Sequence, residues 1–111
     1  MSDPMKHELK TDPEVFQAVW DRTKQYEIRK GDRPFAVGDE LYLKETKHTG
    51  AEMAAGAPLE YTGRIAWRTI AHILRGPVYG LVDGWVILSF DRNDQQNADQ
   101  RRMPSASKEA K

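Results

Sequence analysis

The stretch RIAWRTIAHIL, residues 64–74, contains the longest strand pattern in the chain. Successive side chains of a β-strand point to opposite faces, so the stretch divides into two sets. One face carries Ile65, Trp67, Thr69, Ala71 and Ile73, and the other carries Ala66, Arg68, Ile70, His72 and Leu74. Because apolar residues occupy most positions of both sets, we predict one long strand here.

Three shorter stretches have the composition and alternation of strands: residues 26–30, 41–44 and 84–90. Turns that contain glycine or proline separate the strands, at residues 31–34, 37–40 and 76–80. Leu41 and Leu43 are expected to share one buried face. Residues 47–59 hold two glycines, a proline and several alanines with little periodicity, so we predict a long loop or a hairpin excursion.

The sequence Thr11-Asp12-Pro13-Glu14 is typical of a helix N-terminus. If Thr11 is the N-cap, Glu14 completes a capping box; if Asp12 is the N-cap, Pro13 takes the first helical position. We predict a helix from here to about Lys24, and one early helix followed by four or five strands predicts a small α+β fold built on a curled sheet. The helix carries an apolar stripe, expected in the core, of Val15, Phe16, Val19 and Trp20.

The chain has 111 residues, which is the length of one domain. Its last 21 positions, residues 91–111, contain no aromatic residue and no Ile, Leu or Val. Such a segment buries too little apolar surface to offset the entropy of ordering, so we predict a flexible polar tail there. The folded domain is then residues 6–90.

Charge and composition exclude several classes of protein. Lys and Arg total 17, as do Asp and Glu, so the chain lacks the basic excess of a DNA-coating protein and no DNA partner is expected. The absence of cysteine excludes disulfides and thiolate metal sites. No apolar stretch is long enough to span a membrane, and residues 1–10 do not resemble a secretory signal. We expect a cytoplasmic protein without a membrane partner, as a monomer or a weak dimer.

Metal sites and phosphate-binding loops are not indicated. His7, His48 and His72 are too scattered for a ligand set, and each is expected to be a surface or partly buried side chain. Residues 76–80 lack the lysine and the glycine spacing of nucleotide-binding loops, and no serine lies in a nucleophile elbow. No metal and no cofactor are therefore predicted.

The sequence TKQYEIRK, at the junction of the predicted helix and strand, is half charged and gives the strongest indication of a site. On a strand, Glu27 and Arg29 share one face, and Lys24 can turn toward Glu27. Two interpretations remain. The segment is a solvated outer face with ion pairs worth at most about 1 kcal/mol each, or it is a Lys–Glu–Arg constellation at the mouth of a small barrel, where partial burial favours acid–base use.

Aromatic side chains with polar edges are numerous for one small domain. Most are expected to pack in the core, but one or two beside a basic groove would form a stacking platform for a nucleobase. The set comprises Trp20, Tyr26, Tyr42, Tyr61, Trp67, Tyr79 and Trp85.

The residues Lys24, Glu27 and Arg29, followed by Gly38-Asp39, resemble the signature of ASCH-type domains in the PUA-like superfamily. These domains have a short helix, a Gly-x-Lys-x-x-Glu-x-Arg pattern and a Gly-Asp turn, and the glycine of the pattern is Arg22 here. The resemblance covers about residues 7–90 and points to small bacterial and phage PUA-like domains. Further matching residues are His7, Leu9-Lys10, Pro13, Phe16, Tyr26, Ile28, Lys30, Asp32-Arg33, Phe35, Tyr61-Thr62-Gly63-Arg64, Gly76 and Tyr79-Gly80-Leu81.

The resemblance implies a small mixed β-barrel with one N-terminal helix beside its mouth, and binding of RNA or a modified nucleobase. One branch of the ASCH group hydrolyses N(4)-acetylcytidine and related acylated cytidines. The catalytic lysine of that branch matches Lys24, and a threonine of the branch falls at Glu27. A further catalytic glutamate lies in a helical insertion without a counterpart here. Glu27 would therefore combine roles, or another acid would replace that glutamate: Glu45, Glu60 or Asp83.

The first functional hypothesis is an amidohydrolase that removes the acyl group of an N(4)-acylated cytidine, as a nucleoside or in RNA. Lys24 and Glu27 are its candidate catalytic residues, with Glu27 as the base toward water and Lys24 as the cation that polarises the amide carbonyl or holds the carboxylate. The candidate substrate-binding residues are Arg29, Lys30, Glu45, Tyr61 and Tyr79.

The second hypothesis is a non-catalytic RNA- or nucleobase-binding module. In it, Lys24, Arg29, Lys30 and Arg33 hold the backbone or the base, and an aromatic ring stacks on the base. The third hypothesis is an interaction domain without a ligand.

Overall fold

A computed structural model of the chain describes residues 3–101, and all five strands in it belong to one sheet, in the order β1-β3-β4-β5-β2. Two short helices complete the described part. The fold is therefore of the mostly-sheet α+β class that the sequence predicts. In chain order the elements are β1 (Lys6–Thr11), α1 (Pro13–Trp20), β2 (Tyr26–Lys30), β3 (Glu40–Thr46), α2 (Gly50–Ala54), β4 (Tyr61–Arg75) and β5 (Trp85–Asp99).

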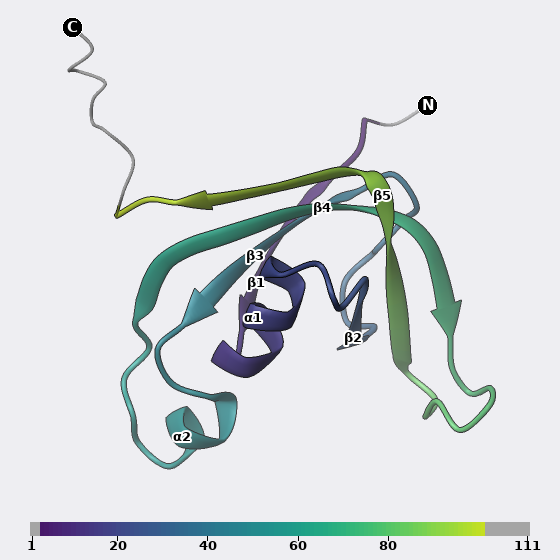
Figure 1. Ribbon diagram of the computed structural model, residues 1–111. Coiled ribbons are helices and arrows are strands. Elements are labelled where there is room, and N and C mark those ends of the chain that lie inside the picture. The colour runs from purple at the N-terminus through teal and green to yellow at the C-terminus, as the bar shows by residue number, and fades with distance from the viewer. Residues whose placement is uncertain (1–2, 102–111) are drawn as a thin grey trace, which may run out of the picture.

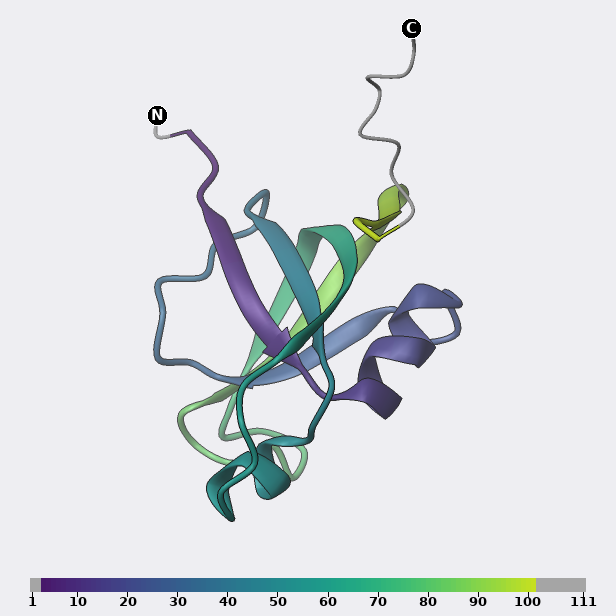
Figure 2. The same ribbon diagram turned by 90° about the vertical axis from the view of Figure 1, so that its left-hand side faces the viewer.

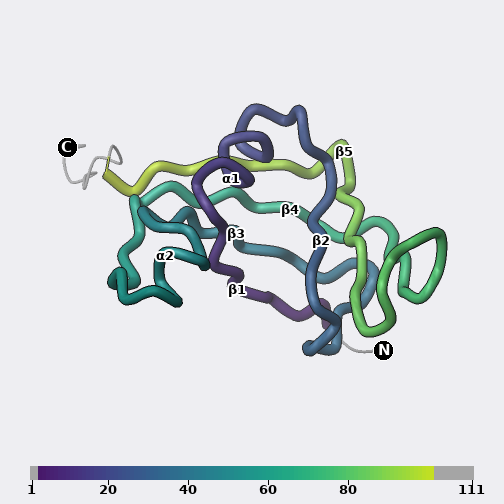
Figure 3. The backbone as a smooth tube through the Cα atoms, turned by 90° about the horizontal axis from the view of Figure 1, so that it is seen from below, coloured from purple at the N-terminus to yellow at the C-terminus, as the bar shows by residue number. Residues whose placement is uncertain are grey.

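The sheet is curled into a half-barrel. β4 and β5 are long, bent strands that arch over α1 (Figure 1). β1 runs parallel to β3, and the other neighbouring strands are antiparallel. Seen from below, β2 crosses the direction of β1, β3 and β4 (Figure 3). Because β1 and β2 are the two edges of the sheet, the half-barrel is open between them.

The core lies between α1 and the inner face of the sheet. Phe16 and Val19 of α1 are fully buried, and Trp20 is partly buried and packs against the core, whereas the expectation that Val15 lies in the core is wrong because its side chain is exposed. The prediction that Leu41 and Leu43 share a buried face is confirmed. The remaining core residues are Leu9, Phe35, Ala66, Ile70, Val86, Leu88 and Phe90.

α1 ends at Trp20 rather than near Lys24. Asp12 is the N-cap and Pro13 follows it, which is one of the two predicted arrangements. Arg22 has a φ of 66°, in the left-handed region, and this conformation turns the chain away from the helix axis. Glycine adopts such a φ at lower cost than arginine does.

β1 is absent from the predicted elements. Its buried side chains are His7, Leu9 and Thr11, so the buried face lacks the apolar alternation that identifies a strand. Parallel pairing with β3 supplies its backbone hydrogen bonds. β1 is therefore fixed by tertiary pairing and not by a local pattern.

His7 joins the start of β1 to the turn before β3. Its Nε2 atom lies 2.8 Å from Oδ2 of Asp39, and its ring contacts that of Phe35. Burial raises the pKa of Asp39, but hydrogen bonds from His7 and from the backbone N–H groups of Met5 and Ala36 outweigh it, so this pKa lies below its ordinary value. The expectation that His7 is a surface or partly buried side chain is wrong, because both partners are buried.

The lowered pKa of Asp39 implies a loss of stability in acid. Its contribution is complete above the ordinary carboxyl pKa of 3.8 and is lost as the pH falls through the lower, folded pKa. We expect Asp39→Asn to cost about 1–3 kcal/mol of unfolding free energy at neutral pH. The difference in unfolding free energy between wild type and variant should become smaller as the pH falls below about 4. Urea unfolding at constant ionic strength measures this difference. A difference that does not change with pH would contradict the stabilising role of the Asp39 carboxylate.

β5 continues to Asp99, so the predicted start of the tail is wrong. The polar part of β5 pairs with the first half of β4, from Arg64–Asp99 to Arg68–Gln95. Backbone hydrogen bonds order this segment although its side chains are polar and mostly exposed. The rest of the predicted tail, residues 102–111, lies outside the described residues.

Arg68 is a buried cation that joins α1 to the second half of β5. Its side chain donates to the backbone carbonyls of Val19, Trp67 and Gln96 and to the side-chain oxygen of Asn97, at 2.6–3.0 Å. Burial lowers the pKa of Arg68 to about 10, so the guanidinium is still charged at neutral pH. A buried charge needs such acceptors, and two of them belong to β5 beyond residue 90.

α2 lies within the predicted loop of residues 47–59. Thr49 and Glu52 form a capping box at its start, and Asp12 accepts a hydrogen bond from the backbone N–H of Gly50 at 3.0 Å. The loop prediction therefore misses one short helix. In Figure 2, α2 lies below the strands and α1 beside them. Neither of these helices, the two that residues 3–101 form, is long and apolar enough to cross a membrane.

Candidate functional site

An open pocket of about 540 Å³ lies between the two edge strands of the half-barrel. β1 forms one wall, β2 forms the facing wall, and the start of α1 lies beside them. The side chains on these walls are charged, aromatic and aliphatic, which is typical of a ligand site. The lining comprises Leu9, Lys10, Thr11, Asp12, Val15, Lys24, all of β2, Asp32, Arg33, Phe35 and Trp85.

Two arginine side chains cross the opening to the free edge of β1. Arg29 donates to the carbonyl oxygen of Lys10 at 2.9 Å, and Arg33 donates to that of Glu8 at 3.0 Å. These carbonyl groups have no strand neighbour on this side, because β1 pairs only with β3. The arginines therefore bridge the edge strands and leave a pocket between them.

Lys24, Glu27 and Arg29 form a hydrogen-bonded cluster on the pocket wall. Nζ of Lys24 lies 2.6 Å from Oε1 of Glu27 and 2.6 Å from the carbonyl oxygen of Tyr26. Arg29 donates from Nε to Oε2 of Glu27 at 3.0 Å, and it also reaches the hydroxyl of Thr11 at 3.3 Å. The structure thus brings together the three charged residues that the sequence singles out.

The β2 strand has its polar face inward. The Glu27 side chain is 3% exposed, whereas its neighbours Tyr26 and Ile28 are exposed. A carboxylate at this depth requires compensating charges, and Lys24 and Arg29 supply them. The interpretation of this segment as a solvated outer face is therefore wrong for Glu27.

The cluster has hydrogen-bonding capacity left for a ligand. An ammonium group has three N–H donors, and Lys24 uses two of them. A carboxylate accepts about four hydrogen bonds, and Glu27 receives one from Lys24 and is held by two nitrogens of Arg29. By this count, one N–H of Lys24 and one acceptor position of Glu27 have no hydrogen-bond partner among the described residues, and the Lys24 ammonium also lies 4.6 Å from the centroid of the Tyr26 ring.

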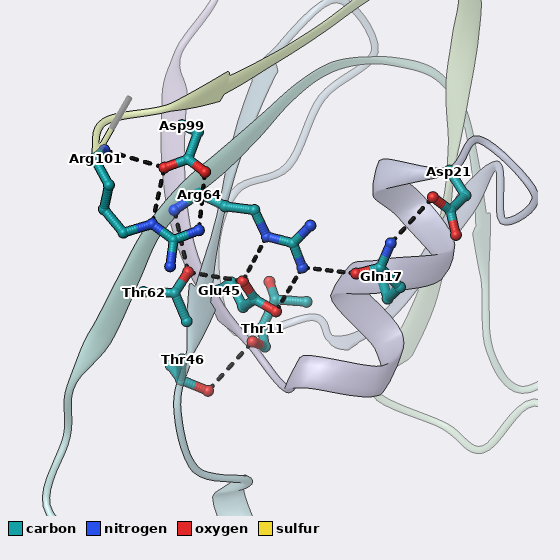
Figure 4. Close-up of polar contacts among 9 residues, drawn as sticks. All are labelled: Thr11, Gln17, Asp21, Glu45, Thr46, Thr62, Arg64, Asp99 and Arg101. Atoms are coloured by element: carbon teal, nitrogen blue, oxygen red, sulfur yellow. Dashed lines mark hydrogen bonds and ion pairs between the residues drawn. The ribbon is translucent and has the colours of Figure 1, made fainter. Parts of the chain in front are cut away.

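Glu45, a predicted substrate-binding residue, belongs to another cluster (Figure 4). Arg64 pairs with both of its oxygens, at 2.8 and 2.9 Å, and the Thr62 hydroxyl donates to it at 2.7 Å. The same guanidinium donates to Gln17 of α1 and lies over the ring of Trp20. Burial raises the pKa of Glu45, but Arg64 and Thr62 outweigh it and hold the pKa below its ordinary value. The Glu45–Arg64 pair joins β3 to β4, Arg64 extends it to α1, and Glu45 does not line the pocket.

Of the other predicted substrate-binding residues, Arg29 and Lys30 line the pocket and the two tyrosines do not. Tyr61 begins β4, where its ring contacts the ammonium group of Lys44 at 4.7 Å. Tyr79 is 94% exposed in the loop between β4 and β5. The sequence gives no means of choosing among the tyrosines, because their distance from the pocket depends on long-range strand pairing.

The carboxylates of the pocket are Glu27, Asp12 and Asp32. Three other acids that the sequence analysis considers beside Glu27 do not line the pocket: Glu45, Glu60 and Asp83. Within residues 3–101, no three His, Cys, Asp or Glu side chains converge to hold a metal ion.

The sequence does not predict the β1 wall of the site, and it predicts aromatic side chains beside the groove without identifying which of seven they are. Lys10 and Thr11 lie on β1, which is itself absent from the predicted strands. The aromatic lining is Tyr26, Phe35 and Trp85. Trp85 reaches the pocket because it pairs with Lys30 across β2 and β5, and no local pattern reports that pairing.

Residues 6–90 match a protein family described as a domain of unknown function, DUF3850. The chain belongs to this family. The DUF3850 match contains every residue that lines the pocket, and it ends within β5. No curated protein matches the chain.

Proposed function

We propose that the pocket is the active site of an amidohydrolase that removes the acyl group from an N(4)-acylated cytosine, on a nucleoside or in RNA. The observation that carries this proposal is the Lys24–Glu27 pair, joined at 2.6 Å on the pocket wall with one donor and one acceptor position free. The resemblance of this segment to ASCH-type amidohydrolases supports the choice of substrate. The half-barrel with α1 beside its opening is compatible with a PUA-like fold, which is part of the proposal.

Hydrolysis of an amide needs an activated water, stabilisation of the oxyanion and a proton for the leaving amine. Glu27 accepts a proton from water as the water oxygen attacks the carbonyl carbon. The free N–H of Lys24 donates to the carbonyl oxygen as it becomes an oxyanion. The proton then passes to the exocyclic nitrogen as the C–N bond breaks, which gives cytosine and a carboxylic acid. Arg29 keeps Glu27 in place by a charge-assisted hydrogen bond.

The test is incubation of the purified chain with N(4)-acetylcytidine, with cytidine and acetate measured by chromatography. The proposal expects both products in equal amounts, at a rate proportional to the protein concentration. Heat-denatured protein is the blank. Acetate release no faster than in the blank, both from N(4)-acetylcytidine and from a short RNA that carries it, would overturn the hydrolase.

A second candidate is a non-catalytic nucleobase- or RNA-binding module. The observation that favours it is the excess of cations over carboxylates in the pocket lining, which suits a polyanion. This module binds cytidine or RNA and releases no acetate. Binding without turnover would therefore replace the first candidate by the second.

A further inference from the structure

The cations of the pocket form two groups with different partners. Lys24 and Arg29 neutralise Glu27. Lys10, Lys30 and Arg33 pair with no carboxylate among the residues that the structure describes, and Arg33 donates only to a backbone carbonyl. All three are exposed and line the same pocket. This second group therefore has charge available for a ligand.

The two lysines of this group stand on opposite edges of the opening. In β1, Lys10 is exposed between the buried Leu9 and Thr11, so its side chain points away from the core. Lys30 is exposed at the end of β2, the facing edge strand. The bridge from Arg29 to the Lys10 carbonyl shows that the two edges are within reach of each other here.

The backbone of β1 adds donors and no free acceptors. Arg29 and Arg33 already occupy the carbonyl groups of Lys10 and Glu8. In a strand, the N–H and C=O groups of one residue point to the same side, so the N–H of Lys10 also faces the opening. Besides Glu27, the carboxylates of the lining are Asp12 and Asp32, and one oxygen of Asp12 accepts a hydrogen bond from the N–H of Gly50. The positive charge of three cations, with the backbone donor, exceeds the negative charge of these two carboxylates.

We infer that Lys10, Lys30 and Arg33 form a phosphate subsite, so that the ligand of the pocket is a phosphorylated nucleoside. This inference rests on the proposed function insofar as the base lies beside Lys24 and Glu27. Lysine and arginine bind phosphate oxygens through charge-assisted hydrogen bonds. The phosphate is that of a mononucleotide or of an RNA backbone, and the chemistry at the subsite is the same.

Calorimetry with cytidine, with cytidine carrying a phosphate on the 5′ or the 3′ hydroxyl, and with a short cytidine oligonucleotide tests the subsite. We expect one of the phosphorylated ligands to bind at least about tenfold more tightly than cytidine at low salt, and the preference to shrink as salt is added. An oligonucleotide that binds more tightly than either mononucleotide assigns the phosphate to RNA, and equal binding assigns it to a mononucleotide. Cytidine that binds as tightly as all phosphorylated ligands would overturn the subsite.

Variants test whether Lys10 and Lys30 cause the preference for the phosphorylated ligand. Lys10→Ala with Lys30→Ala should remove most of the phosphate preference, so that the phosphorylated ligand and cytidine bind with nearly equal affinity. Lys47→Ala, an exposed lysine outside the pocket, is the control and should keep the preference. A double variant that retains the full preference would overturn the assignment to these residues.

These readouts separate the subsite from the hydrolase because binding needs no turnover. If the chain binds the phosphorylated ligand more tightly through these lysines but releases no acetate, the phosphate subsite is supported and the hydrolase is contradicted. If the chain hydrolyses N(4)-acetylcytidine and its monophosphates with equal kcat/KM, the hydrolase is supported and the phosphate subsite is contradicted.

Discussion

A chain that ends at Phe90 should fail to fold cooperatively at room temperature, although it contains the whole pocket and the whole region that matches DUF3850. Truncation there removes the strand pairing from Arg64–Asp99 to Arg68–Gln95. It also removes two acceptors of the buried Arg68, and leaving a buried charge short of partners costs about 3–5 kcal/mol. Since small domains are stable by about 5–15 kcal/mol in total, these losses take away most of the stability.

Thermal unfolding followed by circular dichroism measures this effect. A chain that ends at Arg101 keeps all of β5 and is the control, which should melt in one cooperative transition. If the chain that ends at Phe90 melted at the same temperature as this control, the second half of β5 would be dispensable. The assignment of Arg68 as a structural cation would then be wrong.

A point variant gives a graded form of the same test. Asn97 accepts a hydrogen bond from Arg68 and donates one to the backbone carbonyl of Trp20 at the end of α1. Asn97→Ala should therefore lower the free energy of unfolding by about 1–2 kcal/mol. Asn93→Ala, also exposed in β5, is the matched control, and its effect should stay within about 0.5 kcal/mol.

The parts of the fold that the sequence predicts are those whose strands carry their own apolar pattern. β3, β4 and the first half of β5 place apolar side chains such as Leu43, Ile70 and Leu88 on the buried face. The first strand and the end of the last strand do not, because Lys6–Thr11 and the residues after Phe90 are mostly polar. Backbone pairing with β3 and β4 orders these segments, and pairing partners cannot be identified from one sequence.

In the candidate site, too, the residues that the sequence predicts are those brought together by local spacing. Lys24, Glu27 and Arg29 lie within six consecutive residues, so local spacing is enough to bring them together. Tyr61 and Tyr79 enter the predicted site as aromatic side chains that also match the ASCH-type resemblance, and neither lines the pocket. Burial of Glu27 belongs to one of the two interpretations that the sequence leaves open, and the choice between them depends on the opening of the half-barrel beside β2.

Lys24→Met should reduce the turnover of N(4)-acetylcytidine by about 100-fold or more, the scale of a lost oxyanion donor. Lys44→Met is a matched control. Nζ of Lys44 lies 4.7 Å from a tyrosine ring centroid and 3.6 Å from Glu8, whereas Nζ of Lys24 lies 4.6 Å from a tyrosine ring centroid and 2.6 Å from Glu27. Because Lys44 is outside the pocket, its variant should keep full turnover.

Glu27→Gln separates the base from the scaffold. Glutamine has nearly the shape of glutamate but does not accept a proton from water, so turnover should again fall by about 100-fold or more while the protein stays folded. The double variant Lys24→Met with Glu27→Gln should be little worse than either single variant, because residues that act as a unit are not additive. If the fold-reduction in turnover of the double variant equalled the product of the two single reductions, the residues would act in separate steps. Full turnover by folded Lys24→Met protein would remove Lys24 from the mechanism, since no other ammonium group bonds Glu27 in the described part of the chain.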